Sequence, residues 1–185
     1  GDFHYLKKLG VIDIGSNSVR MVVFDGAARS PAYFFNEKIL CGLGSGLAHS
    51  GKLNPEGRSR AIAAIERFVN MAQVMEVPQL TLIATAAVRS ASDGLSFCNE
   101  IKRKTGKEVN IIDGLEEARL SAQGVMLGWP GAYGLVCDLG GSSMDLAEIN
   151  KGILGKCSTS ELGPFILKEL KGGKKNRKQR IKMVM

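Results

Sequence analysis

Short runs of apolar residues at the start of the chain predict three β-strands. The runs cover Val11 to Asp13, Arg20 to Phe24 and Ala32 to Leu40, and they are rich in Val, Ile and Phe. Asp25-Gly26 is a typical turn sequence, and Pro31 separates the second run from the third. We therefore expect an antiparallel meander.

The spacing of apolar residues then changes from strand to helix. A helix is expected to open at Asn54-Pro55 and to end before Pro78. The residues that fall on its apolar face are Ala61, Ile65, Phe68, Ala72 and Met75. Between the meander and this helix, the glycine-rich segment 41–46 is expected to be a flexible connector, since no helix follows its glycines at the spacing of a dinucleotide fingerprint, with a border of the active cleft as the alternative.

Further strands and helices alternate after this point. Leu80 to Ala84 has the continuous apolar character of a buried parallel strand, and Val109 to Ile112 is predicted to be another strand. Asp93 is expected to cap a helix that ends at Gly106, and a third helix is expected from Glu116 to Leu127. The inward residues of the Asp93 helix are predicted to be Leu95, Cys98 and Ile101, and those of the third helix Ala118, Ala122 and Val125. The fold class is therefore α/β, with a mixed five-stranded sheet and flanking helices.

Two stretches of the chain match one another. V-I-D-I-G-S-N-S at 11–18 and V-C-D-L-G-G-S-S at 136–143 share a strand, an Asp, a glycine turn and a closing Ser. Glycine permits turns in which successive backbone N–H groups point at an anion. One such turn alone is equally well explained as an ordinary hairpin, but two matched copies favour a phosphate chain held between related halves. A third strand of the second copy is expected near Ile153 to Ser158.

The positive charge of the chain is confined to its last residues. The formal net charge of the 185 residues is +7, and residues 168–185 carry all of that excess. No aromatic residues alternate with these basic residues, so base stacking is unsupported and we expect no nucleic-acid partner. Four widely spaced cysteines, an apolar content of 44% and the absence of a membrane-length apolar run predict a soluble cytoplasmic protein without a membrane partner.

The candidate site residues follow strands. Ligands of open α/β sheets bind beyond the carboxyl ends of the strands. Asp13, Arg89, Glu117 and Asp138 all occupy such positions, and we expect them to converge on one crevice.

The side-chain types of these four candidate residues suit phosphoryl transfer. Asp13 and Asp138 are expected to hold Mg²⁺, because this ion prefers oxygen ligands. Arg89 would bind the terminal phosphate, and Glu117 would deprotonate a water molecule. The residues expected to bind phosphate are Gly15, Ser16, Asn17 and Ser18 in the first loop and Gly140, Gly141, Ser142 and Ser143 in the second.

Structural roles remain open for two of these residues. Arg89 could instead bond a carbonyl group or pair with Asp93, and Glu117 could merely complement the positive end of a helix, as its neighbour Glu116 is expected to do. Asp145 is left out of the site because it could pair with a surface lysine.

At these residues the chain resembles the exopolyphosphatase and guanosine pentaphosphate phosphohydrolase family, which has an actin-like, ribonuclease H-like ATPase fold. The matching motifs are D-I-G-S-N-S at 13–18, A-T-A-A-V-R at 84–89, E-E-A-R at 116–119 and D-L-G-G-S-S at 138–143. The resemblance implies release of terminal orthophosphate from inorganic polyphosphate, with Mg²⁺ and often K⁺. It places the catalytic base at Glu117 and phosphate or metal contacts at Arg89, Asp138, Gly140 and Ser143.

The chain departs from the family pattern in two respects. Ser142 stands where family members usually have a third glycine, and family members continue well beyond residue 185. We expect a first actin-like domain at 1–128, an incomplete second domain at 129–170 and a basic tail at 171–185. Exposed strand edges of an unfinished domain also allow a homodimer. Hydrolysis of guanosine pentaphosphate and binding of polyphosphate without turnover remain alternatives.

Overall fold

The first sheet contains five strands and carries most of the core. The computed structural model describes residues 8–25, 33–128, 131, 134–139, 144–151 and 153–160. The strands of this sheet lie in the order β3-β2-β1-β4-β5. Their bounds are β1 (Lys8–Ile14), β2 (Ser18–Asp25), β3 (Tyr33–Leu40), β4 (Gln79–Ala84) and β5 (Val109–Ile111).

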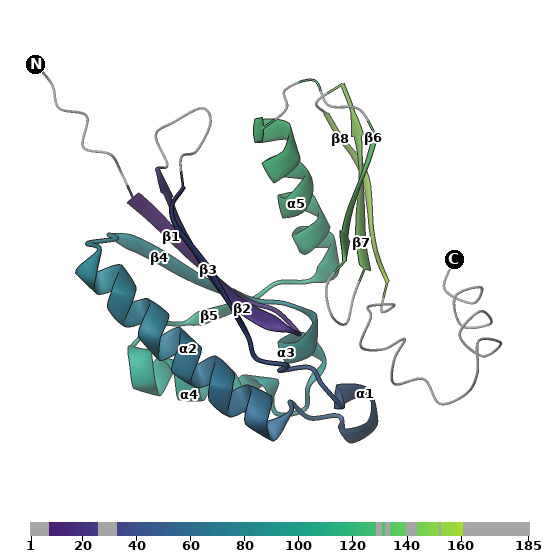
Figure 1. Ribbon diagram of the computed structural model, residues 1–185. Coiled ribbons are helices and arrows are strands. Elements are labelled where there is room, and N and C mark those ends of the chain that lie inside the picture. Colours follow the sequence, from purple (N-terminus) through teal and green to yellow (C-terminus); the bar gives the residue numbers. More distant parts are fainter. Residues whose placement is uncertain are drawn as a thin grey trace, which may run out of the picture.

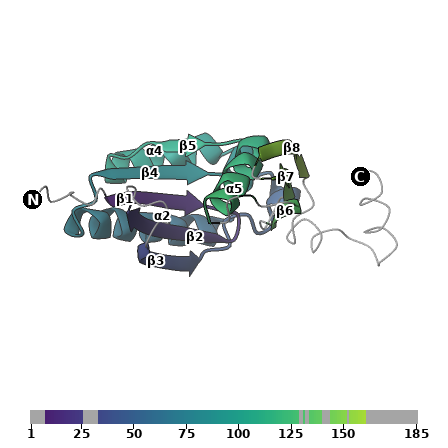
Figure 2. The same ribbon diagram turned by 90° about the horizontal axis from the view of Figure 1, so that it is seen from above.

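The pairing of these strands is mixed, as predicted. β1 with β2 and β2 with β3 form the antiparallel meander, whereas β4 pairs in parallel with β1 and β5 with β4. Each parallel strand follows a helical crossover, because the chain must return to the same end of the sheet before it can run parallel. The carboxyl ends of β1, β4 and β5 therefore share one edge (Figure 2).

Two long helices cover one face of this sheet. They are α2 (Pro55–Val74) and α4 (Gly94–Thr105), and both lie on the same side of the strands (Figure 1). The predicted apolar face of α2 is confirmed, since Ala61, Ile65, Phe68 and Ala72 are at most 2% exposed. Asn54 caps this helix as expected, because its side-chain oxygen accepts a hydrogen bond from the Gly57 N–H at 2.8 Å.

The prediction for the face of α4 is partly wrong. Leu95 is 72% exposed, whereas Phe97 and Ile101 are buried and Cys98 is partly buried. Residues 97 and 101 are four apart and so share a face, and the large ring of Phe97 determines which face packs inward. Asp93 does occupy the position before α4, but its side chain makes no capping bond and turns to other partners.

A second sheet follows the last helix. It consists of β6 (Gly134–Leu139), β7 (Met144–Asn150) and β8 (Ile153–Ser160), all antiparallel in the order β6-β7-β8. Helix α5 (Gly114–Gly128) packs along this sheet (Figure 1), where Ala118 and Ala122 are buried with Ala147 and Ile149. The inward positions predicted at Ala118 and Ala122 are thus confirmed, and the side chain of Val125 lies outside the described residues.

The two matched sequence stretches form equivalent hairpins. Ile14 pairs with Val19 at the end of the first hairpin, and Leu139 pairs with Met144 at the end of the second. Four residues lie between these paired residues in each case, at 15–18 and 140–143. The internal repeat predicted from the sequence is therefore present in the backbone.

Two short helices are not predicted by apolar spacing. They are α1 (Leu47–Ser50) and α3 (Ala86–Ser90), each about one turn long. In the parts of the chain that the structure describes, no helix combines the length and the apolar character needed to cross a membrane.

Candidate active site at the carboxyl edge of the sheet

The first glycine loop is a tight turn between β1 and β2. The Gly15 N–H donates to the Ser18 carbonyl oxygen at 3.0 Å, and a side chain at position 15 would approach that same oxygen. Ser16 is buried, while Asn17 is exposed at the tip. This loop therefore presents a fixed backbone at the point where ligands of such sheets are bound.

The loop is anchored by the segment at 41–44. The Asn17 carbonyl oxygen accepts from the Cys41 and Gly42 N–H groups at 2.8 and 2.9 Å, and the Ser16 carbonyl oxygen accepts from the Gly44 N–H at 2.8 Å. The expectation of a flexible connector is therefore wrong for these residues. The anchoring uses the carbonyl oxygens of Ser16 and Asn17 and not their N–H groups, whereas the Gly15 N–H, which was also expected to bind phosphate, is already bonded to Ser18.

Arg89 lies on α3, directly beyond the carboxyl end of β4. Its Nη1 atom donates to the Ile112 carbonyl oxygen at 2.6 Å, and the Ile112 N–H donates to Ala84 at 3.0 Å. One structural role considered for Arg89, bonding a carbonyl group, is thus observed. The other, pairing with Asp93, is not, because Asp93 pairs with Arg58. A guanidinium group has five N–H donors, so the bond to Ile112 fixes the side chain and leaves capacity for an anion.

The two adjacent glutamates at the start of α5 differ in their surroundings. Glu116 forms an ion pair with Arg119, and hydrogen bonds from Arg119 hold the pKa of Glu116 below its ordinary value. Glu117 instead has a buried carboxylate oxygen, Oε2. Asp113 caps the helix by accepting from the Glu116 N–H at 2.7 Å. The structure therefore gives Glu116 a local role on the helix surface and directs Glu117 inward.

The start of α5 also contacts the second sheet. A Cβ atom added to Gly114 would lie 2.2 Å from the Thr159 Oγ1 atom, so only glycine permits this approach. On β7, the residue paired with Ser160 is Met144, which also pairs with Leu139. The strands that flank the second glycine loop therefore end close to the turn of α5 that carries Glu117.

The register of the two hairpins adds two residues that the sequence reasoning did not assign. Arg20 lies opposite Asp13 in the first hairpin, and Asp145 lies opposite Asp138 in the second. Asp13 and Arg20 are both exposed on the sheet face that α2 and α4 leave uncovered. The matching positions of the repeat could have revealed both residues, since each stands two residues after the closing Ser.

Part of the predicted site lies outside the described residues. These residues are Gly140, Gly141, Ser142 and Ser143, together with the side chain of Asp138. Among the remaining described residues, no three His, Cys, Asp or Glu side chains form a cluster that could hold a metal ion. The basic segment 171–185 also falls outside the description.

A cavity of about 540 Å³ occurs at the opposite edge of the first sheet. Leu9, Gly10, Gln79 and Leu80 line it, and they lie near the starts of β1 and β4. It is therefore separated from Gly15 and Arg89 by the length of the strands, and it is no part of the candidate site.

Comparison with known proteins finds relatives of this chain among exopolyphosphatases. Exopolyphosphatase 1 of Mycobacterium tuberculosis and that of Mycobacterium bovis are each 30% identical to the chain over 144 residues, which is 76% of this chain and 42% of the relative. The chain thus spans less than half the length of these curated relatives.

Solved structures show the same fold. An exopolyphosphatase from Cytophaga hutchinsonii matches with a TM-score of 0.82 and 28% identity, over 90% of this chain and 54% of the other. The Aquifex aeolicus member of the Ppx/GppA family matches with a TM-score of 0.73 and 23% identity, over 94% of this chain and 58% of the other. The expected α/β fold, with a mixed five-stranded sheet and flanking helices, is therefore confirmed. The model of the Ppx/GppA phosphatase family matches residues 22–181, and the chain belongs to this family.

Proposed function

We propose that the chain supplies the phosphate-binding and water-activating residues of an exopolyphosphatase, which releases terminal orthophosphate from inorganic polyphosphate. The observation that carries this proposal is the position of Glu117. Its carboxylate has a buried oxygen in the first turn of α5, beside the strand ends that flank the second glycine loop. Family membership and the names of the mycobacterial relatives support the same activity.

Each residue group would perform one part of the reaction. Backbone N–H groups of residues 16–18 and 140–143 would bind phosphate oxygens, and Arg89 would bind the terminal phosphate. Glu117 would accept a proton from a water molecule as the water oxygen attacks the terminal phosphorus. The bond from that phosphorus to the bridging oxygen then breaks, and the shortened chain leaves with the electron pair.

The acidic residues fit a divalent cation of the Mg²⁺ type. Asp13 is the last residue but one of β1 and has an exposed side chain, and Asp138 has the equivalent place in β6, opposite a second aspartate. Carboxylate oxygens are the donors that Mg²⁺ prefers, and phosphate oxygens and water commonly complete its coordination. We propose that Asp13 and Asp138 hold Mg²⁺, which would neutralise phosphate charge, and that K⁺ would act at the same polyanion.

The test compares two neighbouring substitutions on one helix. Orthophosphate release from polyphosphate is measured with Mg²⁺ for the wild type, Glu117→Gln and the control Glu116→Gln. Loss of a general base lowers the rate by about 10² to 10⁴-fold, so we expect this effect for Glu117→Gln. Glu116 belongs to a surface ion pair, and its substitution should change the rate by no more than about twofold.

Equal rates for the wild type and Glu117→Gln would contradict the assignment of the base. Binding of polyphosphate by the wild type without release of orthophosphate would instead support a non-catalytic role for this chain. A parallel assay with guanosine pentaphosphate measures the preference between the two substrates.

A further inference from the structure

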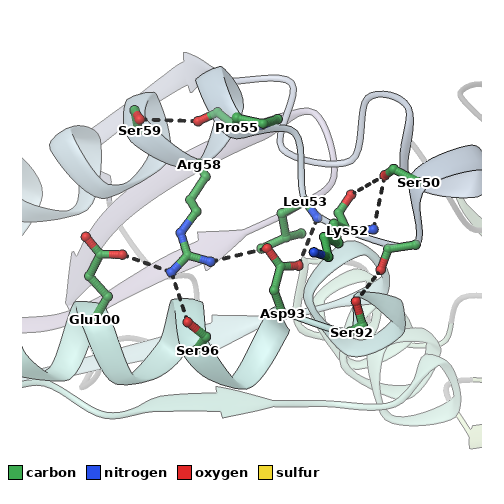
Figure 3. A network of polar contacts seen from close by, with 11 residues as sticks. Ser50, Lys52, Leu53, Pro55, Arg58, Ser59, Ser92, Asp93, Ser96 and Glu100 are labelled. Atoms are coloured by element: carbon green, nitrogen blue, oxygen red, sulfur yellow. Dashed lines mark hydrogen bonds and ion pairs between the residues drawn. The ribbon is translucent and has the colours of Figure 1, made fainter.

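A polar network joins α2 to the turn that follows α3 (Figure 3). The Arg58 Nη1 atom lies 3.3 Å from Asp93 Oδ2, and Nη2 lies 2.9 Å from Glu100 Oε2 and 3.3 Å from Ser96 Oγ. The guanidinium carbon also sits 5.6 Å from the centre of the Phe97 ring. The side chains of Arg58, Asp93 and Glu100 are only 20–27% exposed. A single arginine therefore holds two polar side chains of α4, Ser96 and Glu100, together with Asp93 just before that helix.

Asp93 extends this network to the segment before α2. Its Oδ1 atom accepts from the Leu53 N–H at 2.9 Å. Next to it, both the N–H and the Oγ of Ser92 donate to the Gly51 carbonyl oxygen at 2.9 Å (Figure 3). The turn between α3 and α4 is thus bonded to residues 51–53 by three hydrogen bonds.

The segment at 51–54 continues to the first glycine loop. The Asn54 N–H donates to the Leu43 carbonyl oxygen at 2.9 Å, and Gly57 packs so closely that an added Cβ atom would lie 2.6 Å from the Gly42 oxygen. Residues 41–44 in turn bond the carbonyl oxygens of Ser16 and Asn17.

The other end of the network reaches Arg89. A Cβ atom added to Gly94, the first residue of α4, would lie 2.0 Å from the Val88 carbonyl oxygen, so α3 and α4 are in close backbone contact. Arg89 is the next residue of α3, and it bonds to the Ile112 carbonyl oxygen beyond β5. A shift of the 91–94 turn would therefore displace both Arg89 and the first glycine loop.

We propose that Arg58 and Asp93 are positioning residues that hold the first glycine loop, residues 15–18, in a fixed position relative to Arg89. This inference rests on the proposed function for its purpose, although the coupling itself is structural. Neither residue touches substrate. They act through Leu53 and residues 41–44 on one side and through Gly94 and α3 on the other.

A second arginine of α2 provides a matched control. Arg67 also forms a two-bond ion pair, with Glu37 of β3, and its guanidinium carbon lies 5.8 Å from the centre of the Phe68 ring. No bond from Arg67 leads to the 41–44 segment or to the 91–94 turn among the contacts of the described residues. Arg58→Met and Arg67→Met therefore each remove an ion pair and an aromatic contact from the same helix. Only Arg58 is connected by hydrogen bonds to the first glycine loop.

The primary readout is amide hydrogen exchange, which does not depend on activity. In Arg58→Met, the protection of the Cys41, Gly42 and Gly44 amides should fall about tenfold further than that of the core strand β1. Arg67→Met should leave this ratio unchanged. Asp93→Asn keeps an oxygen acceptor for the Leu53 N–H, so its amides at residues 41–44 should retain most of the protection that Asp93→Ala removes. This pair of variants tests the proposal even if Arg58→Met does not fold.

The second readout is the dissociation constant for tripolyphosphate. It should rise about tenfold in Arg58→Met and stay unchanged in Arg67→Met. Uniform loss of protection across all amides, or equal effects of the two arginine variants, would overturn the positioning role. A wild-type chain that does not bind tripolyphosphate would instead overturn the proposed function, while the exchange experiment would still decide the coupling.

Discussion

Adjacent side chains of the same type take different roles in this chain because their neighbours differ. Glu116 is held by Arg119, and Glu117 has a buried oxygen. Arg58 and Arg67 also differ in their neighbours. Each forms an ion pair that joins α2 to another element, but only the partners of Arg58 are bonded to residues next to the candidate site. Residue type alone therefore does not assign a function at these positions.

The Arg58 network predicts a pH dependence of stability. The hydrogen bond from Arg58 is the main reason that the pKa of Glu100 is lowered. A carboxyl group with a depressed folded-state pKa stabilises the fold above its unfolded-state pKa, about 4.3 for Glu, and this contribution disappears as the pH falls through the folded-state pKa. The wild type should therefore lose more stability than Arg58→Met between about pH 5 and pH 3, by about 1 kcal/mol or less for a pair near the surface.

Urea unfolding midpoints at a series of pH values measure this difference. Glu116 also titrates with a lowered pKa, but it is present in both proteins and cancels in the comparison. Identical pH profiles for the wild type and Arg58→Met would show that the pair contributes nothing to folding.

Contacts between elements are set by glycines as much as by large side chains. Gly57 allows the start of α2 to lie against residues 42–43, and Gly114 allows α5 to lie against β8. These contacts place the helices that support the candidate site.

The substitution Gly57→Ala has two opposing effects on stability, one through helix propensity and one through packing. Alanine is favoured over glycine inside a helix by about 1 kcal/mol, which would stabilise α2. The new methyl group, however, would lie 2.6 Å from the Gly42 oxygen and 3.0 Å from the Leu43 Cα atom. Overpacking against backbone costs about 1–3 kcal/mol, so we expect net destabilisation.

The measurement is the free energy of unfolding in urea, with Ser59→Ala as the control on the same helix. Ser59 is exposed, and its change should stay within about 0.5 kcal/mol of the wild type. A Gly57→Ala protein as stable as the wild type would contradict this expectation. It would show that residues 42–43 move to accommodate the methyl group at little cost in free energy.

The long elements could be predicted because their apolar spacing is strong. The buried face of α2 follows directly from residues 61, 65, 68 and 72, and the meander follows from three β-branched runs. The helices α1 and α3 could not be predicted, because one turn is too short to show a helical period. The error at Leu95 arose because the apolar residues of α4 fit more than one face, and only tertiary packing of Phe97 selects between them.

The candidate site was predictable where it follows strand ends. Gly15, Arg89 and the start of α5 share an edge because β1, β4 and β5 are parallel, which the order of elements already indicated. The anchoring of the loop by residues 41–44 was not predictable, since it consists of backbone bonds that carry no side-chain signal. The Arg58 network was missed for a different reason, because its members are far apart in the sequence.

At the scale of the whole molecule, the two repeated hairpins belong to different sheets. The first belongs to the five-stranded sheet and the second to the sheet that packs on α5 (Figures 1 and 2). The expected division at residue 128 remains a proposal, and α5 packs along the second sheet.

A competing location for anions is the basic tail. The tail at 171–185 has seven basic residues and no acidic one, so it would attract a polyphosphate chain by charge alone. Attraction of this kind weakens strongly with salt, whereas contacts with a preformed loop weaken less.

The most direct test follows backbone amide chemical shifts while tripolyphosphate and Mg²⁺ are added at 0.15 M salt. If the account is correct, the largest shifts occur at Gly15–Ser18 and at Gly114–Glu117. Shifts confined to the basic tail at 171–185, or centred on Leu9, Gly10, Gln79 and Leu80 around the cavity at the opposite edge of the sheet, would contradict it.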